Sequence, residues 1–348
     1  EEGDDLSGID SMKPMTAVTC MLAQAAAFGW ASLSMAQGWV PQKHVELIAP
    51  NAPGGAMDST ARIVQRLWQD LKLLPVSSAV MPKDGPLPWL DRPDAMAAMT
   101  ADAQLASFPP DVREAIMHWP DNGYMILRNC FTAAEVHAVN EEVDRLIRDR
   151  VVDFNFTGRK IMFAFQHSEL LRSVVDDSRL RHVLDFALGK HMKPFQSINF
   201  LTGSEQAAHS DSIHMTTYPL GYLAAAWIAL EEMTPDNGPL IYYPGSHKLR
   251  YLLNDGYDHG GGTFTIGAEA YARYEQEVAR EIGDGRFTAH EFIAQTGDVL
   301  IWHANLLHGG KKMTSPGTSR KSMAIHYFAD DVICYHELTQ RAAMMDDH

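Results

Sequence analysis

The chain has 348 residues, of which 46% are hydrophobic and 21% are charged. This is the composition of a globular protein large enough for one large domain or two smaller ones. Its net charge of −15 argues against a polyanionic partner, so nucleic acid is not expected. Cys20, Cys130 and Cys334 lie far apart with no CxxC spacing, which argues against a disulfide framework or a zinc site and fits a reducing compartment.

Residues 1–95 differ from the rest of the chain and are predicted to form an N-terminal extension. After an acidic start, Lys13 precedes an apolar run of mainly small residues over 17–36. This run resembles a secretory signal, and a helix packed on the domain fits the same pattern equally well. Its polar interruptions argue against a stable membrane span.

Within this extension, residues 44–50 are predicted to form a strand, followed by a Pro-Gly-Gly loop and a helix from Asp58 to about Leu71. This order, over residues 40–78, resembles the start of the periplasmic solute-binding proteins of tripartite tricarboxylate transporters. The resemblance implies export and carboxylate binding. Because no further match follows, we expect a fusion or a misassigned start, joined through a linker over residues 79–95.

The second domain, residues 96–348, is predicted to begin with elements that build a core. Residues 124–128 form a strand after a turn. Thr132 and Glu135 have the spacing of a capping box, which begins a helix to about Arg150. A strand over 160–165 and short helices over 170–175 and 179–188 follow.

From residue 196 onward the pattern changes to short strands separated by turns. Strands are predicted over 196–201, 223–230, 240–243, 299–303 and 322–328. Without alternating helices, they indicate a mainly β fold with flanking helices, built on an antiparallel jelly-roll (double-stranded β-helix, cupin-like) core. An insertion over 249–291, with a helix over 268–282, is either a lid that contacts substrate or a solvated excursion that only packs.

His209-Ser210-Asp211 is the candidate metal-binding motif. On a strand, side chains two residues apart point to the same side. An imidazole and a carboxylate can therefore converge on one ion. A second histidine would complete the two-His, one-carboxylate set of non-haem Fe(II) oxygenases.

Further motifs follow in order along the domain: Trp227, the run Tyr243-Pro244-Gly245-Ser246-His247-Lys248, Gly297-Asp298, His303, His308-Gly309 and Arg320. Together with the His209 motif, their order and approximate spacing resemble the phytanoyl-CoA dioxygenase family, which includes ectoine hydroxylase. The resemblance covers residues 115–330. It implies a double-stranded β-helix that uses Fe(II), 2-oxoglutarate as co-substrate, and O2.

Carried over by position, the resemblance implies that His209, Asp211 and His308 are the iron ligands. It also implies that Arg320, twelve residues after His308, binds the far carboxylate of 2-oxoglutarate. A guanidinium offers a bidentate fork to a carboxylate, although a surface salt bridge would also account for an arginine here. Lys321 is expected on the opposite face of the strand.

The chain departs from the family at Gly310, where many members have a serine that helps to hold 2-oxoglutarate. Thr217, Gln196 or Asn199 is expected to supply the missing polar contact. Trp227 is expected either beside the co-substrate or in the core.

Three other histidines are candidates near the metal. His214 is expected on the open side of the iron, in contact with substrate. His308 is preferred to His303 as the ligand, because Gly309 and Gly310 allow the backbone to turn tightly beside the metal. His214 is likewise not expected to be a ligand, and His247 is expected at the corner of the hairpin.

The expected reaction is hydroxylation of an aliphatic C–H bond of a small, polar metabolite, with release of succinate and CO2. The alternatives are a periplasmic solute-binding protein for a carboxylate and a non-catalytic ligand-binding barrel. A cytoplasmic location is expected, because the cytosol supplies 2-oxoglutarate and Fe(II), while the signal-like run leaves export open. The expected partner is a small-molecule substrate, and the sequence predicts no oligomeric state.

Overall fold

The computed structural model of the protein describes residues 76–82, 85–155, 159–262, 266–315 and 317–342. The signal-like run at 17–36, the predicted strand at 44–50 and the predicted helix at 58–71 lie outside the described residues. The solute-binding resemblance over 40–78 lies almost entirely outside them as well.

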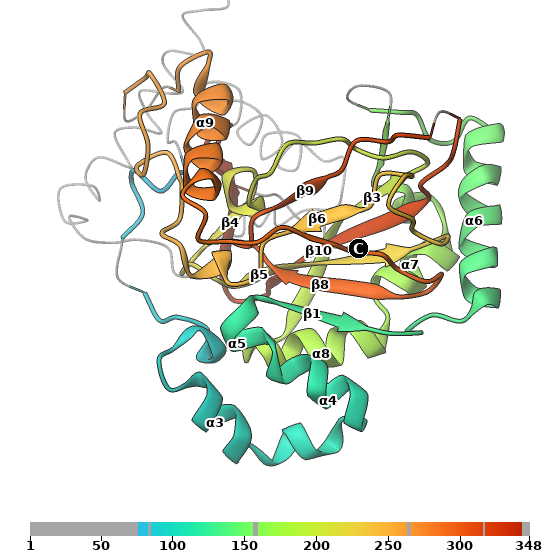
Figure 1. Ribbon diagram of the computed structural model, residues 1–348, viewed down its shortest axis with the longest axis horizontal. Coiled ribbons are helices and arrows are strands. Elements are labelled where there is room, and N and C mark those ends of the chain that lie inside the picture. The colour runs from blue at the N-terminus through green and yellow to red at the C-terminus, as the bar shows by residue number, and fades with distance from the viewer. Residues whose placement is uncertain (1–75, 83–84, 156–158, 263–265, 316, 343–348) are drawn as a thin grey trace, which may run out of the picture. The chain divides into compact units, whose positions relative to one another are not determined.

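A six-stranded antiparallel sheet forms the larger wall of the barrel (Figure 1), in the order β1-β8-β5-β10-β3-β2. Its strands are β1 (Tyr124–Leu127), β2 (Lys160–Met162), β3 (Met192–Phe200), β5 (Leu223–Ala229), β8 (Val299–His303) and β10 (Ser322–Ala329). The order places strands from distant parts of the chain side by side.

Two three-stranded sheets complete the β structure. One has the order β7-β6-β9, with β7 (His290–Glu291), β6 (Leu240–Tyr242) and β9 (His308–Gly310). The other has the order β12-β11-β4, with β4 (Thr216–Tyr218), β11 (Ile333–His336) and β12 (Arg341–Ala342). Trp227, Tyr242, Phe292 and Trp302 belong to one buried cluster that fills the interior between the large sheet and the β6 sheet. This arrangement confirms the predicted jelly-roll fold with flanking helices.

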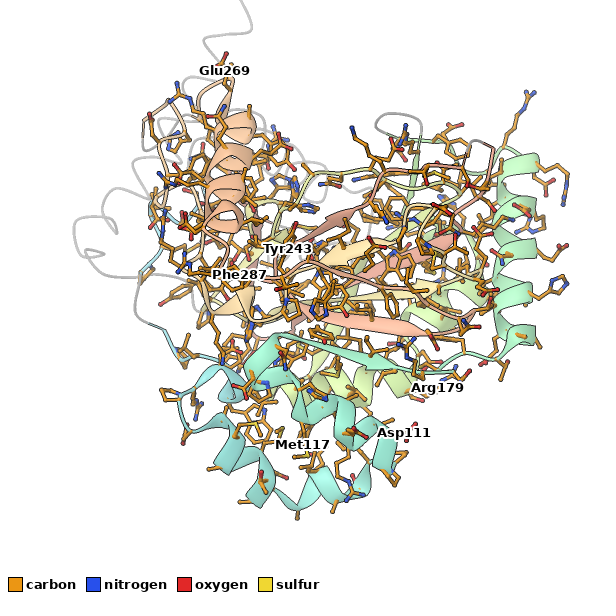
Figure 2. All side chains as sticks on the ribbon, in the orientation of Figure 1. Asp111, Met117, Arg179, Tyr243, Glu269 and Phe287 are labelled. Atoms are coloured by element: carbon orange, nitrogen blue, oxygen red, sulfur yellow. The ribbon has the colours of Figure 1, made fainter. Side chains whose placement is uncertain are left out.

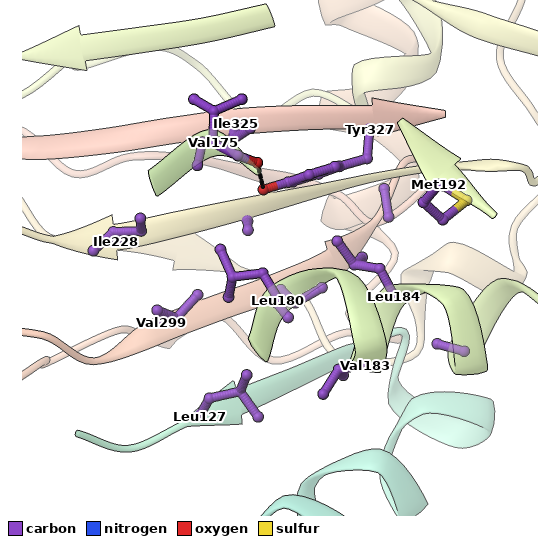
Figure 3. Close-up of a cluster of buried hydrophobic side chains, with 14 of the residues drawn as sticks. Leu127, Val175, Leu180, Val183, Leu184, Met192, Ile228, Val299, Ile325 and Tyr327 are labelled. Carbon is purple, nitrogen blue, oxygen red and sulfur yellow. Dashed lines mark hydrogen bonds between the residues drawn. The ribbon is translucent and has the colours of Figure 1, made fainter. Parts of the chain in front are cut away.

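Helices cover the outer face of the large sheet: α3 (Ala95–Ala101), α4 (Pro110–Met117), α5 (Trp119–Asn122), α6 (Ala133–Arg148), α7 (Glu169–Val175) and α8 (Ser178–Leu188). Figure 3 shows part of the core between these helices and the large sheet. There the Tyr327 hydroxyl of β10 donates to the Val175 carbonyl at 2.9 Å. The predicted capping box is present, because Thr132 and Glu135 each bond to the other's backbone N–H.

The described part of residues 79–95 differs from the predicted linker, because it packs on the domain. Leu90 is buried, and the Trp89 indole donates to the Phe186 carbonyl at 2.7 Å. Leu90 and the half-buried Trp89 lie within a Pro-rich run, and their packing on the domain outweighs the turn-forming composition around them.

The insertion over 249–291 carries helix α9 (Ala270–Gly283). Its buried residues Tyr274 and Val278 share a cluster with Ile213, Leu252 and Leu307 of the barrel. The helix therefore packs on the barrel, as it would in a lid or in an excursion that only packs, so the lid stays a prediction. Figure 2 shows Glu269, its N-cap residue, at the end of the helix that points away from the sheets. Among the helices of the described residues, none combines the length and the hydropathy needed to span a bilayer.

Candidate metal centre

His209, Asp211 and His308 are buried and offer ligand atoms that all lie within 4.8 Å of one another. His308 begins β9, and its backbone exchanges two 2.8 Å hydrogen bonds with that of His209. Nε2 of His308 lies 3.6 Å from Oδ1 of Asp211. The described residues contain one such group of metal-ligating side chains, and it is the predicted one.

Backbone carbonyls fix the orientation of both imidazoles. Nδ1 of His209 lies 2.9 Å from the Ala207 carbonyl, and Nδ1 of His308 lies 3.0 Å from the Leu306 carbonyl. Because a carbonyl only accepts, each Nδ1 carries the proton and each Nε2 keeps a lone pair for a metal. Burial and the neighbouring His308 hold the pKa of His209 well below its usual value, which favours the neutral, ligating form.

The Asp211 carboxylate is held by two groups from the barrel wall. Its Oδ2 accepts a 2.7 Å hydrogen bond from Nε1 of Trp302 and lies 3.6 Å from Nε2 of His326. Burial alone would raise the pKa of Asp211, but His308 and His326 outweigh it and lower that pKa, so the carboxylate is ionised. Asp211 begins a 3-10 turn, Asp211–Ile213, so the predicted extended segment ends at Ser210.

Arg320 is a buried cation with an exposed fraction of 2%. Its Nη1 donates to the Ser322 hydroxyl at 2.8 Å, and its guanidinium lies over the Phe200 and Trp227 rings at 5.3 and 5.4 Å. Burial lowers its pKa to about 10, so it remains charged at neutral pH. Within the described part of the chain it has no ion-pair partner, and its buried Nε has no hydrogen bond. A buried cation of this kind favours a bound anion.

Lys321 lies on the opposite face of the strand, as predicted. Its ammonium is 3.1 Å from the carboxylate of Asp144 on α6, on the outer surface. This contrast favours Arg320 over Lys321 as the anion-binding residue.

The polar residues predicted to contact 2-oxoglutarate differ in position. Gln196 pairs across β3 and β10 with His326 and so shares the inner face. Asn199 pairs instead with Met323, whose side chain belongs to the core under the helices. The prediction for Asn199 is therefore wrong, because residues three apart on one strand face opposite sides.

Thr217 lies in β4, and its hydroxyl is already engaged. It donates to the Pro219 carbonyl at 2.7 Å and accepts from the Tyr222 N–H at 3.2 Å. These bonds hold a local turn and argue against the predicted role of Thr217 in co-substrate binding.

Gly310 lies against the segment 204–206. A Cβ added to Gly310 would lie 2.5 Å from the Ser204 hydroxyl oxygen and 2.9 Å from the Glu205 nitrogen. The Ser204 hydroxyl therefore occupies the space that a side chain at position 310 would need. Ser204 could not be predicted from the sequence, because only the fold brings it beside Gly310.

His214 lies next to the metal-binding group, as predicted. Its ring centroid is 5.6 Å from that of His209 and 5.3 Å from that of Tyr271. Burial, reinforced by His336, lowers the pKa of His214 to about 4. Tyr271 was not predicted as a site residue.

Lys160 and Gln206 are two further polar residues that sequence analysis did not identify. Nζ of Lys160 donates to the Gln206 amide oxygen at 3.1 Å, and the Gln206 nitrogen lies 3.2 Å from Nε2 of His209. Burial lowers the pKa of Lys160, whereas nearby Asp211 raises it. No motif marks either residue, because they come from separate segments that meet only in the fold.

His303 and His247 lie away from the metal-binding group, in agreement with their rejection as ligands. Nε2 of His303 is 3.1 Å from the Asp91 carboxylate, and Nδ1 of His303 accepts from the Asn305 N–H. The His247 and His303 rings are 5.6 Å apart. This buried cluster joins Asp91 to β8.

Comparisons with known proteins agree with this geometry. The ectoine dioxygenase of Stutzerimonas stutzeri is 25% identical over 251 residues, which cover 64% of this chain and 79% of that protein. The human peroxisomal phytanoyl-CoA dioxygenase is 21% identical over 237 residues, which cover 61% and 67%. Neither supports the resemblance of residues 40–78 to a transporter protein.

A solved structure with a similar fold is SnoK, described as a non-haem α-ketoglutarate-dependent carbocyclase from nogalamycin biosynthesis. It has a TM-score of 0.53 and 18% sequence identity, covering 66% of this chain and 87% of that one. At this identity the likeness shows the fold.

The sequence profile of the phytanoyl-CoA dioxygenase family, PhyH, matches residues 119–322. This is more than half of the 348-residue chain. The chain therefore belongs to the phytanoyl-CoA dioxygenase family of Fe(II)- and 2-oxoglutarate-dependent oxygenases, as the sequence predicted.

Proposed function

We propose that this protein hydroxylates an aliphatic C–H bond of a small, polar metabolite, with Fe(II) bound by His209, Asp211 and His308. The observation that carries this proposal is the convergence of the three ligand atoms within 4.8 Å. With Nδ1 of both histidines bonded to carbonyls, the donor set is two neutral nitrogens and one carboxylate oxygen. This set suits non-haem Fe(II) and leaves coordination positions for other ligands.

Arg320 is the residue proposed to bind the far carboxylate of 2-oxoglutarate. Its unpaired buried Nε and its position over two aromatic rings fit a flat, anionic partner. Trp227 and Gln196 line the same inner face and are proposed to border the co-substrate.

When bound, Fe(II) and 2-oxoglutarate supply the oxidising chemistry, in which one atom of O2 enters the substrate and the other enters succinate, with loss of CO2. The protein fixes the geometry for this reaction. Trp302 holds the Asp211 carboxylate by a hydrogen bond, and Arg320 would pair with the far carboxylate of 2-oxoglutarate. The apolar interior that includes Leu300 and Phe292 limits the access of water.

The proposed substrate class rests on the polar groups beside the ligands. His214 and Gln206 lie near His209, and Tyr271 contacts both of them. We propose that His214 contacts substrate. Relatives are named for substrates as different as ectoine and phytanoyl-CoA, so their names do not choose between substrate classes. A cytosolic location is proposed because that compartment supplies both Fe(II) and 2-oxoglutarate.

The first test is an anaerobic titration of the purified protein with Fe(II) and then with 2-oxoglutarate. We expect a weak visible charge-transfer band that is absent in His308→Ala, and succinate release once O2 is admitted. Iron binding without the band would reject the proposed co-substrate site. Failure to bind iron would reject the ligand assignment and favour a non-catalytic barrel.

Arg320→Met tests the co-substrate contact. Removing one partner of a buried charge pair costs about 2–5 kcal/mol, so the Kd of 2-oxoglutarate in the anaerobic titration should rise at least about thirtyfold. Lys321→Met is the matched control, because it removes a neighbouring cation from the outer face. Equal effects of the two substitutions would contradict the assignment.

A further inference from the structure

We propose that Tyr274, on helix α9 of the insertion, is a positioning residue for the metal centre. Its hydroxyl accepts the backbone N–H of Ser210, the residue between the ligands His209 and Asp211. This inference rests on the proposed ligand assignment.

The contact joins the insertion to the metal-binding tripeptide within the core. The Ser210 nitrogen lies 2.8 Å from the Tyr274 hydroxyl oxygen, and the Ser210 hydroxyl lies 3.2 Å from the same atom. Tyr274 has an exposed fraction of 0%. Burial raises the pKa of Tyr274, so the phenol stays protonated and keeps one hydrogen to donate while it accepts from Ser210.

The bonded N–H belongs to the peptide unit that links His209 to Ser210, where the bonding pattern of the backbone changes. His209 is fixed by its two backbone bonds to His308, whereas the chain turns into a 3-10 helix at Asp211. Tyr274 therefore fixes the peptide plane between His209 and Ser210, and the orientation of this plane affects how the side chains of His209 and Asp211 converge. Without this acceptor, a buried N–H would have to find another partner or shift the tripeptide.

Helix α9 also contacts the second ligand-bearing segment. Tyr274 and Val278 pack with Ile213, just after Asp211, and with Leu307, just before His308. One face of α9 therefore supports both segments that converge on the metal.

Tyr271, one turn earlier on the same helix, contacts the neighbouring polar groups. Its ring stacks on Tyr274 with centroids 5.9 Å apart, and its hydroxyl accepts from Gln206 at 3.4 Å. The same helix thus supports the ligands through Tyr274 and borders the proposed substrate side through Tyr271.

The test compares Tyr274→Phe with Tyr257→Phe, in the full-length protein. Both remove one phenolic oxygen. The Tyr257 hydroxyl is buried without a partner among the described residues, and its ring meets the Tyr274 ring at 6.0 Å. Fe(II) is the probe, and its anaerobic affinity is measured by competition with a chelator. Groups that orient metal ligands typically affect affinity ten- to a hundredfold, so we expect about this loss for Tyr274→Phe and no change for Tyr257→Phe.

Amide hydrogen exchange of a peptide spanning residues 209–211 is a second measurement that does not depend on iron. In Tyr274→Phe the Ser210 N–H should exchange faster than in the unmodified protein and in Tyr257→Phe. Unchanged iron affinity and unchanged exchange in Tyr274→Phe, with iron binding lost in His308→Ala, would overturn the inference and leave the proposed function intact. Failure of the unmodified protein to bind iron would overturn both.

Discussion

The proposed iron ligands are oriented by groups that the His209-Ser210-Asp211 motif does not contain. Two backbone carbonyls set the imidazole tautomers, and the Trp302 indole donates to the Asp211 carboxylate at 2.7 Å. A buried carboxylate that loses such a donor is freer to rotate and worse placed for a metal.

Trp302→Phe should therefore weaken Fe(II) binding about tenfold or more, because outer partners of metal ligands typically contribute ten- to a hundredfold. The affinity is measured anaerobically by chelator competition. Trp119→Phe is the control, since the buried Trp119 indole has no hydrogen-bond partner among the described residues. It should lower thermal stability through lost packing without changing iron affinity. A similar loss of iron affinity in both variants would contradict a specific role for the Trp302 N–H.

At the level of single residues, the sequence was informative where a periodic rule applied. The opposite faces of Arg320 and Lys321 follow from the pleat of a strand, whereas His209 and Asp211 converge although the chain turns into a 3-10 helix at Asp211. The same rule should have separated Gln196 from Asn199, which are three residues apart. Trp302 could not be assigned, because its bond to Asp211 joins positions 91 residues apart in the chain.

At the level of elements, the metal centre depends on the close approach of β9 to the segment 204–206. Gly310 has no side chain, and a Cβ there would lie 2.9 Å from the Glu205 nitrogen and 2.5 Å from the Ser204 hydroxyl. A backbone atom cannot yield as a flexible side chain can. The glycine therefore permits β9 to lie where His308 meets His209.

Gly310→Ser should destabilise this protein. Overpacking of a tight site typically costs about 1–3 kcal/mol, measured as a lower midpoint of denaturant unfolding, and iron affinity should fall as β9 shifts. Gly283→Ala is the control, because nothing lies within 4 Å of an added Cβ there, and in helix α9 it should be neutral or stabilising. If Gly310→Ser were as stable as the unmodified protein and bound iron equally well, the close approach would not constrain the site.

The elements that the sequence predicted best carry strong local patterns. The capping box of α6, the apolar strands β5 and β8 and helix α9 all appear close to their predicted bounds. Strands β7 and β12, with two residues each, were missed because so short a segment has no detectable period. Such strands are defined by their partners in the fold rather than by their own residues.

At the level of the whole domain, a buried carboxylate joins three parts of the described chain. Glu337, with an exposed fraction of 0%, accepts hydrogen bonds from the backbone N–H of Ser78 at 3.0 Å and of Asn254 at 2.7 Å, and from the Ser78 hydroxyl. It thereby links the segment 76–82, the insertion and the region after β11. No local sequence motif predicts this contact, because Ser78 and Glu337 are 259 residues apart in the chain.

Burial raises the pKa of Glu337 above its ordinary value, although Ser78 and Asn254 partly oppose the effect. The folded state then binds more protons than the unfolded state at pH values above the ordinary pKa. The contribution of Glu337 to the stability of the folded protein should therefore increase as the pH falls from 7 toward 5.

The variant Glu337→Gln cannot titrate at this position. The stability of the unmodified protein minus that of Glu337→Gln, from denaturant unfolding at each pH, should therefore increase as the pH falls, by at most about 1.4 kcal/mol for each unit of raised pKa. Glu141→Gln, on the exposed surface of α6, measures the effect of removing one surface carboxylate and should give a smaller trend. A difference that shrinks as the pH falls would mean that the three donors outweigh burial and that Glu337 holds the domain together as an ionised group.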